Sequence, residues 1–207
     1  MDTYRFMIVP ALLVSLTLHA APSVPAASPP PDEQHLEQLT REAALRHQVP
    51  PEALQAVTLA ESGRLIGGRF RPWPWTLNVG GRGYYYNSRE EACRALTRFM
   101  RVRSLKRIDA GLAQTNLGWH GHRFVTSCDA LDPSRNLDAA ARILRDCYQT
   151  RNGSWLDAAA CYHHPRGGLQ ARRYRATVQK HLTRLVAQSA APVLLVDIPE
   201  KHTGIPQ

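Results

Sequence analysis

The hydrophobic pattern of the chain is mainly that of amphipathic helices. Apolar side chains recur three and four residues apart in several segments, and most of these segments are bounded by residues typical of helix ends. Ser88, Asp132 and Ser154 are suited to capping the helices that follow them, and Pro133 suits a first helical position. The predicted helices cover residues 33–48, 50–63, 88–103, 133–152, 155–162 and 169–186.

Two stretches depart from this helical spacing. Residues 65–87 hold two aromatic runs around Gly80-Gly81, which predicts a β-hairpin or an ordered loop. Its rings, such as Trp75 and Tyr85, either pack on the helical core or form a platform for sugar rings. Residues 108–120 are punctuated by glycine and lack the spacing of a helix. The expected fold class is therefore predominantly α-helical, an α+β domain with a small β-hairpin or aromatic loop insert.

The two ends of the chain do not have the pattern of a packed domain. Residues 1–26 combine a basic start, a short apolar run and a small-residue region, the pattern of a secretory signal peptide. An uncleaved anchor is the alternative, since the positive start is weak and a clean A-x-A cleavage motif is lacking. A proline-rich linker at 27–32 leads into one domain at 33–186, and residues 187–207 form a C-terminal tail. We expect an exported, periplasmic protein with no stable membrane span after signal cleavage.

Export changes the interpretation of the cysteines. Cys93, Cys128, Cys147 and Cys161 are an even number without a C-x-x-C motif, so two disulfides are expected and three pairings are open. Cys128 precedes and Cys147 ends the same predicted helix, which favours Cys128–Cys147 together with Cys93–Cys161. The irregular spacing of the cysteines and nearby histidines disfavours a zinc site. We expect neither a metal nor a cofactor.

The chain is strongly basic. It has 26 lysine and arginine residues against 17 aspartate and glutamate residues, a net charge of +9, and Lys106 is the only lysine before position 180. Arginine pairs with carboxylates and phosphates, so nucleic acid, an anionic envelope and an acidic polymer are all compatible partners. Nucleic-acid binding rests on this charge alone, because the arginines are spread over several predicted helices and export is predicted. We therefore expect no nucleic-acid partner.

Glu61 is the main candidate for chemistry. Leu54, Val57 and Glu61 fall three and four residues apart, so the glutamate continues the apolar face of its predicted helix. A carboxyl group there is partly desolvated and lies at the negative end of the helix dipole. Both effects favour the protonated form, which is the form of a general acid. The alternative is a glutamate at a frayed helix end that points into water.

Three separated motifs occur in an order that resembles one enzyme family. The motifs are Glu61-Ser62-Gly63, then Gly111-Leu112-Ala113-Gln114-Thr115-Asn116, then Ala160-Cys161-Tyr162-His163. They resemble the soluble lytic transglycosylase family, of the lysozyme-like superfamily, over about residues 36–186. The sequence motif P-W-T-x-N-V-x-G at 74–81 is similar to that of family members carried by conjugative elements and secretion systems.

The resemblance implies a role for each motif. Glu61 would be the catalytic acid and base, with Ser62 beside it in the substrate region. Gln114 and Asn116 would hydrogen-bond sugar substituents. Tyr162 would lie against the glutamate or the substrate, and its neighbour His163 would contact the substrate.

Three positions depart from the family's usual residues. Ala113 stands where methionine is usual, which would leave a roomier pocket. His163 stands where asparagine is usual, and Cys161 displaces an apolar residue. These differences affect the surroundings of Tyr162 more than Glu61.

The implied substrate is the peptidoglycan glycan strand. The activity would cleave between N-acetylmuramic acid and N-acetylglucosamine with formation of a 1,6-anhydro end, opening the wall for a secretion or conjugation apparatus. Ordinary glycoside hydrolysis uses two carboxylates, and Asp109 is the other carboxylate near the motifs. We expect Asp109 to be a structural turn former before Gly111. If Asp109 faced Glu61, a lysozyme-type hydrolase would be the alternative. Ala113 and His163 favour a third interpretation, a non-catalytic or weakly active peptidoglycan-binding scaffold.

Overall fold

The helical character predicted from the sequence is confirmed. The computed structural model describes residues 32–151 and 153–189. Its helices are α1 (Glu33–Arg46), α2 (Pro51–Ser62), α3 (Arg89–Val102), α4 (Leu117–His120), α5 (Pro133–Thr150), α6 (Trp155–His163) and α7 (Gly168–Ser189). Short 3-10 turns lie at Leu105–Arg107, Gly121–Arg123 and Ser127–Leu131. With its small antiparallel strands, the fold is predominantly helical and of the α+β class.

The starts of α3, α5 and α6 are set by the capping side chains that the sequence indicates. The side chain of Ser88 accepts a hydrogen bond from the backbone N–H of Glu91, and Ser154 does the same at the start of α6. Asp132 caps α5, and Pro133 occupies its first position, where no N–H is needed. These contacts span three residues, so they depend on local sequence alone.

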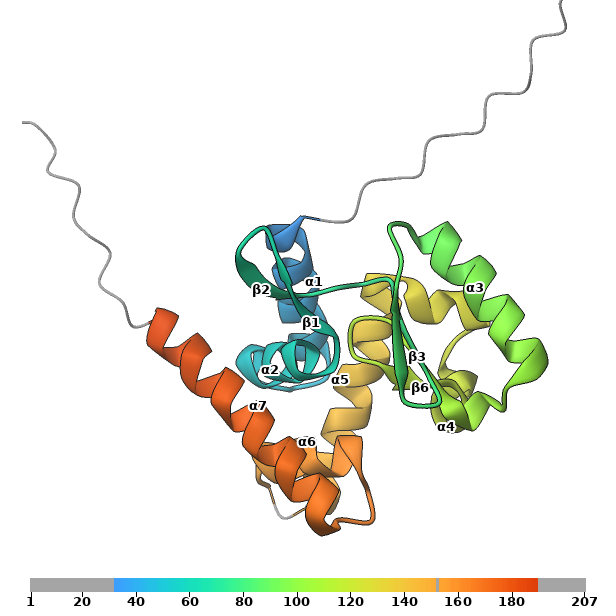
Figure 1. Ribbon diagram of the computed structural model, residues 1–207. Coiled ribbons are helices and arrows are strands. Elements are labelled where there is room, and N and C mark those ends of the chain that lie inside the picture. Colours follow the sequence, from blue (N-terminus) through green and yellow to red (C-terminus); the bar gives the residue numbers. More distant parts are fainter. Residues whose placement is uncertain (1–31, 152, 190–207) are drawn as a thin grey trace, which may run out of the picture.

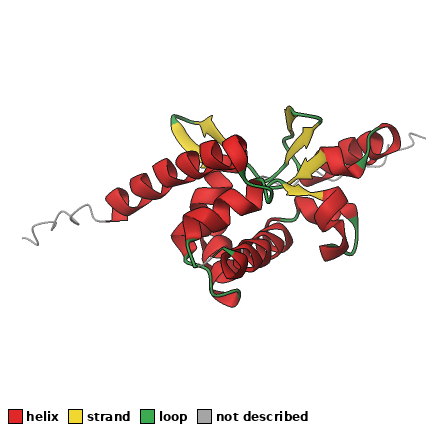
Figure 2. Ribbon diagram, turned by 90° about the horizontal axis from the view of Figure 1, so that it is seen from below, coloured by secondary structure: helices red, strands yellow, loops and turns green. Residues whose placement is uncertain are grey.

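The strands form two small sheets, which the sequence prediction did not resolve (Figure 2). Strand β1 (Gly63–Ile66) pairs antiparallel with β2 (Arg69–Pro72). Strands β3 (Thr76–Val79), β4 (Arg82–Tyr85), β5 (Ile108–Ala110) and β6 (Thr115–Asn116) form the second sheet in the order β4-β3-β5-β6. The stretch expected to hold one hairpin therefore holds two, and the glycine-punctuated stretch supplies β5, β6 and α4. Strands this short depend on pairing across the sheet, which has little signature along the chain.

The buried apolar side chains form two clusters. The first joins α1, α2, α5, α6 and α7 around Leu54 and Leu144, and the second joins β3, β5 and α3 around Leu77 and Leu96. In Figure 1, α1, α2, α6 and α7 lie on one side and β3, α3 and α4 on the other, with α5 running between them. The chain passes from the second cluster to the first immediately after β5, and the candidate site lies at this crossing.

The crossing requires glycine at position 111. Ala110 belongs to the second cluster, whereas Leu112 and Ala113 belong to the first. Gly111 has a φ of +83°, and a Cβ there would lie 2.3 Å from the carbonyl oxygen of Ala130. Only a residue without a side chain fits this left-handed, crowded position.

The disulfide pairing differs from the sequence prediction. Cys93 is bonded to Cys128, and Cys147 is bonded to Cys161. The predicted pairs Cys128–Cys147 and Cys93–Cys161 are wrong because α5 is a continuous helix. Cys147 lies fourteen residues beyond the first residue of α5, a rise of about 20 Å, whereas a disulfide needs Cα atoms less than about 7 Å apart.

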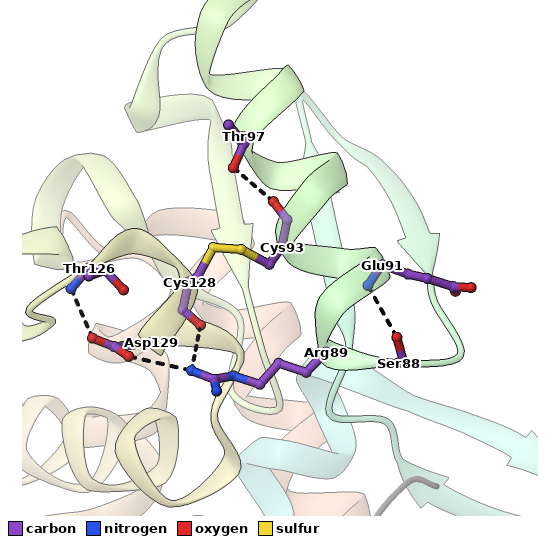
Figure 3. The surroundings of a disulfide bond; sticks show 8 residues. All are labelled: Ser88, Arg89, Glu91, Cys93, Thr97, Thr126, Cys128 and Asp129. Atoms are coloured by element: carbon purple, nitrogen blue, oxygen red, sulfur yellow. Dashed lines mark hydrogen bonds and ion pairs between the residues drawn. A yellow bond between two sulfur atoms is a disulfide. The ribbon is translucent and has the colours of Figure 1, made fainter. Parts of the chain in front are cut away.

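Each disulfide reinforces one side of the molecule. Cys93–Cys128 joins α3 to the 3-10 turn before α5, and Figure 3 shows Arg89 beside it. The Arg89 guanidinium donates to the carbonyl of Cys128 at 3.3 Å and pairs with Asp129 at 3.4 Å. Cys147–Cys161 joins α5 to α6, directly before Tyr162.

The predictions for the chain ends fall largely outside the described residues. The expected signal peptide, the linker up to residue 31 and the tail from residue 190 are not among them. Within residues 32–151 and 153–189, no helix has both the length and the apolar character needed to cross a bilayer. The two disulfides fit an oxidising compartment.

Candidate functional site

Glu61 lies in the last turn of α2 with most of its side chain removed from solvent. Leu54 and Val57, on the same face, are fully buried, and the Glu61 side chain is 13% exposed. The alternative of a frayed-end glutamate pointing into water is therefore wrong. Gly63 follows in an extended conformation, and a Cβ there would lie 2.2 Å from the carbonyl oxygen of Leu59. Glycine is needed at this end of α2 for close approach, not for a left-handed turn.

His163, at the C-terminal end of α6, pairs with Glu61. Its Nδ1 lies 3.7 Å from Glu61 Oε1, and its ring stacks on Tyr174 with centroids 4.3 Å apart and planes 2° from parallel. The contact with the Glu61 carboxylate raises the pKa of His163, although burial acts in the opposite direction. The negative charge of Asp109 adds to the increase. The sequence analysis expected His163 to contact substrate, and the structure places it against Glu61.

Tyr162 links α6 to the central motif. Its hydroxyl donates a 2.7 Å hydrogen bond to the carbonyl of Ala113. Burial, with the nearby charge of Glu61, raises the pKa of Tyr162 above its ordinary value, so the hydroxyl remains a donor at all physiological pH. Tyr162 therefore holds the motif loop beside Glu61.

Tyr174 is a site residue that the sequence did not single out. It lies on the buried face of α7, and helical spacing does not indicate which element such a face meets. Its buried hydroxyl has no hydrogen-bond partner of normal geometry among the described residues. Burial and the Glu61 charge raise the pKa of Tyr174 well above its ordinary value. A neutral phenol donor is thus available on the α7 side of the glutamate.

Asp109 is not the turn former that we expected. It lies in the middle of β5, opposite Asn78 of β3 and Asn116 of β6. The Asn116 side-chain amide donates to Asp109 Oδ1 at 2.7 Å. Burial raises the pKa of Asp109 to about 6; the Asn116 hydrogen bond opposes this shift and the Glu61 charge adds to it. Asp109 therefore belongs to the electrostatic surroundings of Glu61.

The side chains of Gln114 and Asn116 are engaged within the protein. Asn116 holds Asp109 and the carbonyl of Lys106 through its amide nitrogen, and its amide oxygen caps α4. The Gln114 amide donates to the carbonyls of Gly111 and Thr76 at 2.7 and 3.1 Å. The predicted sugar contacts of these two residues thus compete with internal hydrogen bonds.

Ser62 is a structural link. It is 2% exposed, and its hydroxyl donates a 2.6 Å hydrogen bond to the carbonyl of Leu112. This bond fixes the end of α2 to the motif loop. Ser62 therefore acts on the site through position, because a side chain so buried cannot meet a glycan.

Asn136 organises the motif loop from α5, and sequence reasoning missed it. Its fully buried amide accepts from the N–H of Ala113 at 2.8 Å and donates to the carbonyls of Ala110 and Ala130 at 3.0 Å. A third donor contact, at 3.3 Å, reaches the hydroxyl of Thr115. A polar residue among the apolar positions of an amphipathic helix was the available signal.

The aromatic insert divides into core and surface rings. Trp75 is 4% exposed and packs in the second cluster, so the prediction that it contacts substrate is wrong. The strand that it precedes, β3, is buried and places the indole inward. Tyr85 is 51% exposed, with the Arg64 guanidinium 4.6 Å from its ring centroid. Of the two rings, Tyr85 alone is available to a ligand.

A sizeable cavity among the described residues lies apart from Glu61. It has a volume of about 590 Å³, is bounded by α1, α2, β2 and α7 and includes Thr58, Phe70 and His181, but not Glu61, Asp109 or His163. Among the described residues, no group of three or more histidine, cysteine, aspartate or glutamate side chains could hold a metal ion.

Compared with protein-family models, curated proteins and solved structures, the chain has no match. The arrangement of the site is consequently the basis for any assignment. It brings together a largely buried carboxyl group, a histidine, a second carboxyl group and two neutral phenols from α2, α6, β5 and α7. Such groups suit proton transfer to and from a bound molecule.

Proposed function

We propose that this protein is a lysozyme-like lytic transglycosylase that cleaves peptidoglycan between N-acetylmuramic acid and N-acetylglucosamine. One observation carries the proposal: the carboxyl group of Glu61 is largely withdrawn from water and is held beside the loop at 111–116 and the end of α6. The three motifs that resemble the transglycosylase family thus meet at one carboxyl group.

The proposed reaction needs one acid–base group. Protonated Glu61 gives its proton to the oxygen that bridges the two sugars as the bond from that oxygen to C1 breaks. The resulting carboxylate takes the proton of the muramic C6 hydroxyl while the oxygen of that hydroxyl bonds to C1. This closes a 1,6-anhydro ring and restores protonated Glu61. Acid–base assistance of this kind contributes about 10²–10⁴-fold in rate.

Digestion of purified murein, with mass spectrometry of the products, tests the proposal. We expect anhydro-muropeptides from the wild-type protein and their loss with Glu61→Gln. Glu52→Gln is the matched control, since it removes the same charge from the first turn of the same helix. Release of anhydro products at the wild-type rate by Glu61→Gln would refute the assignment.

A second candidate is a lysozyme-type hydrolase in which Asp109 assists. The specific observation in its favour is that Asp109 lies within the electrostatic influence of Glu61, with its pKa raised to about 6. Hydrolysis with two carboxyl groups leaves reducing ends in place of anhydro ends. Reducing products that depend on both Glu61 and Asp109 would therefore select the hydrolase. Sedimentation with murein but no products would indicate a binding scaffold.

The proposed place of action is the periplasm, in the service of a secretion or conjugation apparatus. The signal-peptide pattern at 1–26 and the two disulfides support export. The similarity of residues 74–81 to versions carried by conjugative elements supports the apparatus. Fractionation of cells that express the full chain tests the compartment, and recovery in the cytoplasm with reduced cysteines would contradict it.

A further inference from the structure

His163 is placed to exchange a proton with Glu61. Its Nδ1 is 3.7 Å from Glu61 Oε1, slightly longer than a hydrogen bond. Such contacts are often long in unliganded sites and shorten when substrate binds. Because the ring stacks in parallel on Tyr174, packing holds the imidazole in position independently of the carboxylate.

The groups around His163 favour a proton on its ring. Glu61 from α2 and Asp109 from β5 are the charges that act on it, and both stabilise the imidazolium form. Tyr162 on α6 and Tyr174 on α7 stay neutral, because burial raises the pKa of each phenol. The two carboxylates thus favour a proton on the His163 ring, close to Glu61.

We propose that Glu61 and His163 share one proton, and that His163 is the positioning residue that supplies this proton to Glu61. The inference rests on the proposed function for its place in catalysis, while its structural basis is the contact between the two side chains. It assigns a use to the position where the family that the chain resembles usually has asparagine, whose side chain does not titrate.

The proton follows a closed path. In the free protein it stays on His163, and ionised Glu61 forms an ion pair with the imidazolium. A bound glycan removes water from the pair, and two neutral groups are then favoured over two partly buried charges. The Nδ1 proton moves to Oε1, Glu61 passes it to the bridging oxygen, and the C6 hydroxyl proton replaces it on Glu61. It returns to His163 when the product leaves.

The dependence of kcat/KM on pH separates proton sharing from simple packing. We compare wild type with His163→Asn, which keeps a polar donor, and His163→Phe, which keeps a ring to stack on Tyr174. Neither substitute titrates. Proton sharing predicts that the alkaline limb of both variants moves to lower pH by about two units or more, because ordinary histidine and glutamate pKa values differ by about two units and the pKa of His163 is raised further. Rates on the acid side should stay close to wild type.

Two outcomes of this comparison would overturn the inference. One is a pair of variant profiles that superimpose on wild type. The other is an unchanged profile for His163→Phe with a uniform loss for His163→Asn, which would show that only ring packing matters. His164→Asn is the matched control, because it removes the adjacent imidazole, whose residue caps α6 through its backbone N–H.

A readout without substrate separates this inference from the proposed function. NMR titration of the His163 ring should show a raised pKa in wild type and in Glu52→Gln, and a fall in Glu61→Gln. The same His163 pKa in wild type and Glu61→Gln would overturn proton sharing whether or not the protein cleaves murein. If the His163 pKa falls in Glu61→Gln but the wild-type protein leaves murein uncleaved, proton sharing is supported and the proposed function is refuted.

Discussion

The hydroxyl of Tyr162 donates a 2.7 Å hydrogen bond to the carbonyl of Ala113, forty-nine residues earlier in the chain. Ala113 is fully buried, and its backbone N–H is bound by Asn136 from α5. One peptide segment is therefore held from two helices at once. Because the same segment leads to Gln114 and Thr115, this contact sets the position of the motif loop relative to Glu61.

Replacing Tyr162 by phenylalanine should weaken both stability and activity. The change leaves the Ala113 carbonyl buried without a partner, which costs about 1–3 kcal/mol in the free energy of unfolding. Movement of the loop should lower the rate of murein cleavage by about tenfold to a hundredfold. Urea unfolding and product release measure the two effects. Tyr148→Phe, at a ring that stacks on Trp155, is the control, and equal effects at both positions would contradict the proposed role of the Tyr162 bond.

Asp109→Asn should make the protein more stable at neutral pH. Burial raises the pKa of Asp109 from 3.8 to about 6 in the folded state, so between these values the folded protein binds more protons than the unfolded chain. Stability therefore falls as pH rises through this window, by about 1–3 kcal/mol in total. The asparagine variant lacks this loss, so its advantage should be full above pH 6 and absent below pH 3.8. Urea unfolding at a series of pH values measures it; a constant difference at every pH would argue against the shift.

Removing the Cys147–Cys161 disulfide should affect the site more than removing Cys93–Cys128. The bridges span sequence separations of 14 and 35 residues, so chain entropy predicts losses of about 3 and 4 kcal/mol in the free energy of unfolding. Cys161, however, directly precedes Tyr162 and His163. We therefore expect the double alanine variant that lacks Cys147–Cys161 to be the more stable of the two but the less active. Thermal unfolding and murein digestion below both transitions provide the comparison, and equal activities would show that the α5–α6 bridge does not position the site.

Trp75 and Tyr85 should respond oppositely to truncation. Trp75→Ala removes a buried indole and should cost about 3–5 kcal/mol of stability. Tyr85→Ala removes an exposed ring whose cation–π contact with Arg64 contributes about 1 kcal/mol or less. If Tyr85 stacks on sugar, its loss should reduce sedimentation with murein while the unfolding midpoint stays nearly unchanged. Undiminished sedimentation would exclude the ring from the binding surface.

Local structure was predictable where its causes are local. The starts of α3, α5 and α6 follow from Ser88, Asp132 and Ser154, whose side chains bond to the N–H three residues on. The burial of Leu54 and Val57 follows from their spacing. Strands β5 and β6 were not predicted, because a strand of two or three residues exists only through its partners.

The candidate site was predictable only in part. The sequence indicated Glu61, Tyr162 and His163, and the structure brings these three together. It did not indicate Tyr174 or Asn136, which look like ordinary inward positions of α7 and α5 until the facing element is known. Asp109 was interpreted from its distance to Gly111 along the chain, whereas its surroundings are set by Asn116 across a β ladder and by Glu61 on another helix.

The pattern of residues along the chain was enough to locate the six longer helices, the caps of α3, α5 and α6, the even set of cysteines and the carboxyl group on an apolar helix face. The helices, their caps and the apolar helix face depend on residues within one or two helical turns of one another, and the number of cysteines is read directly from the chain. The pairing of the cysteines, the exposure of the aromatic rings and the groups that surround Glu61 follow only from how the helices and strands pack together. Those features depend on contacts between residues such as Tyr162 and Ala113, whose separation in space is set by the packing of whole helices.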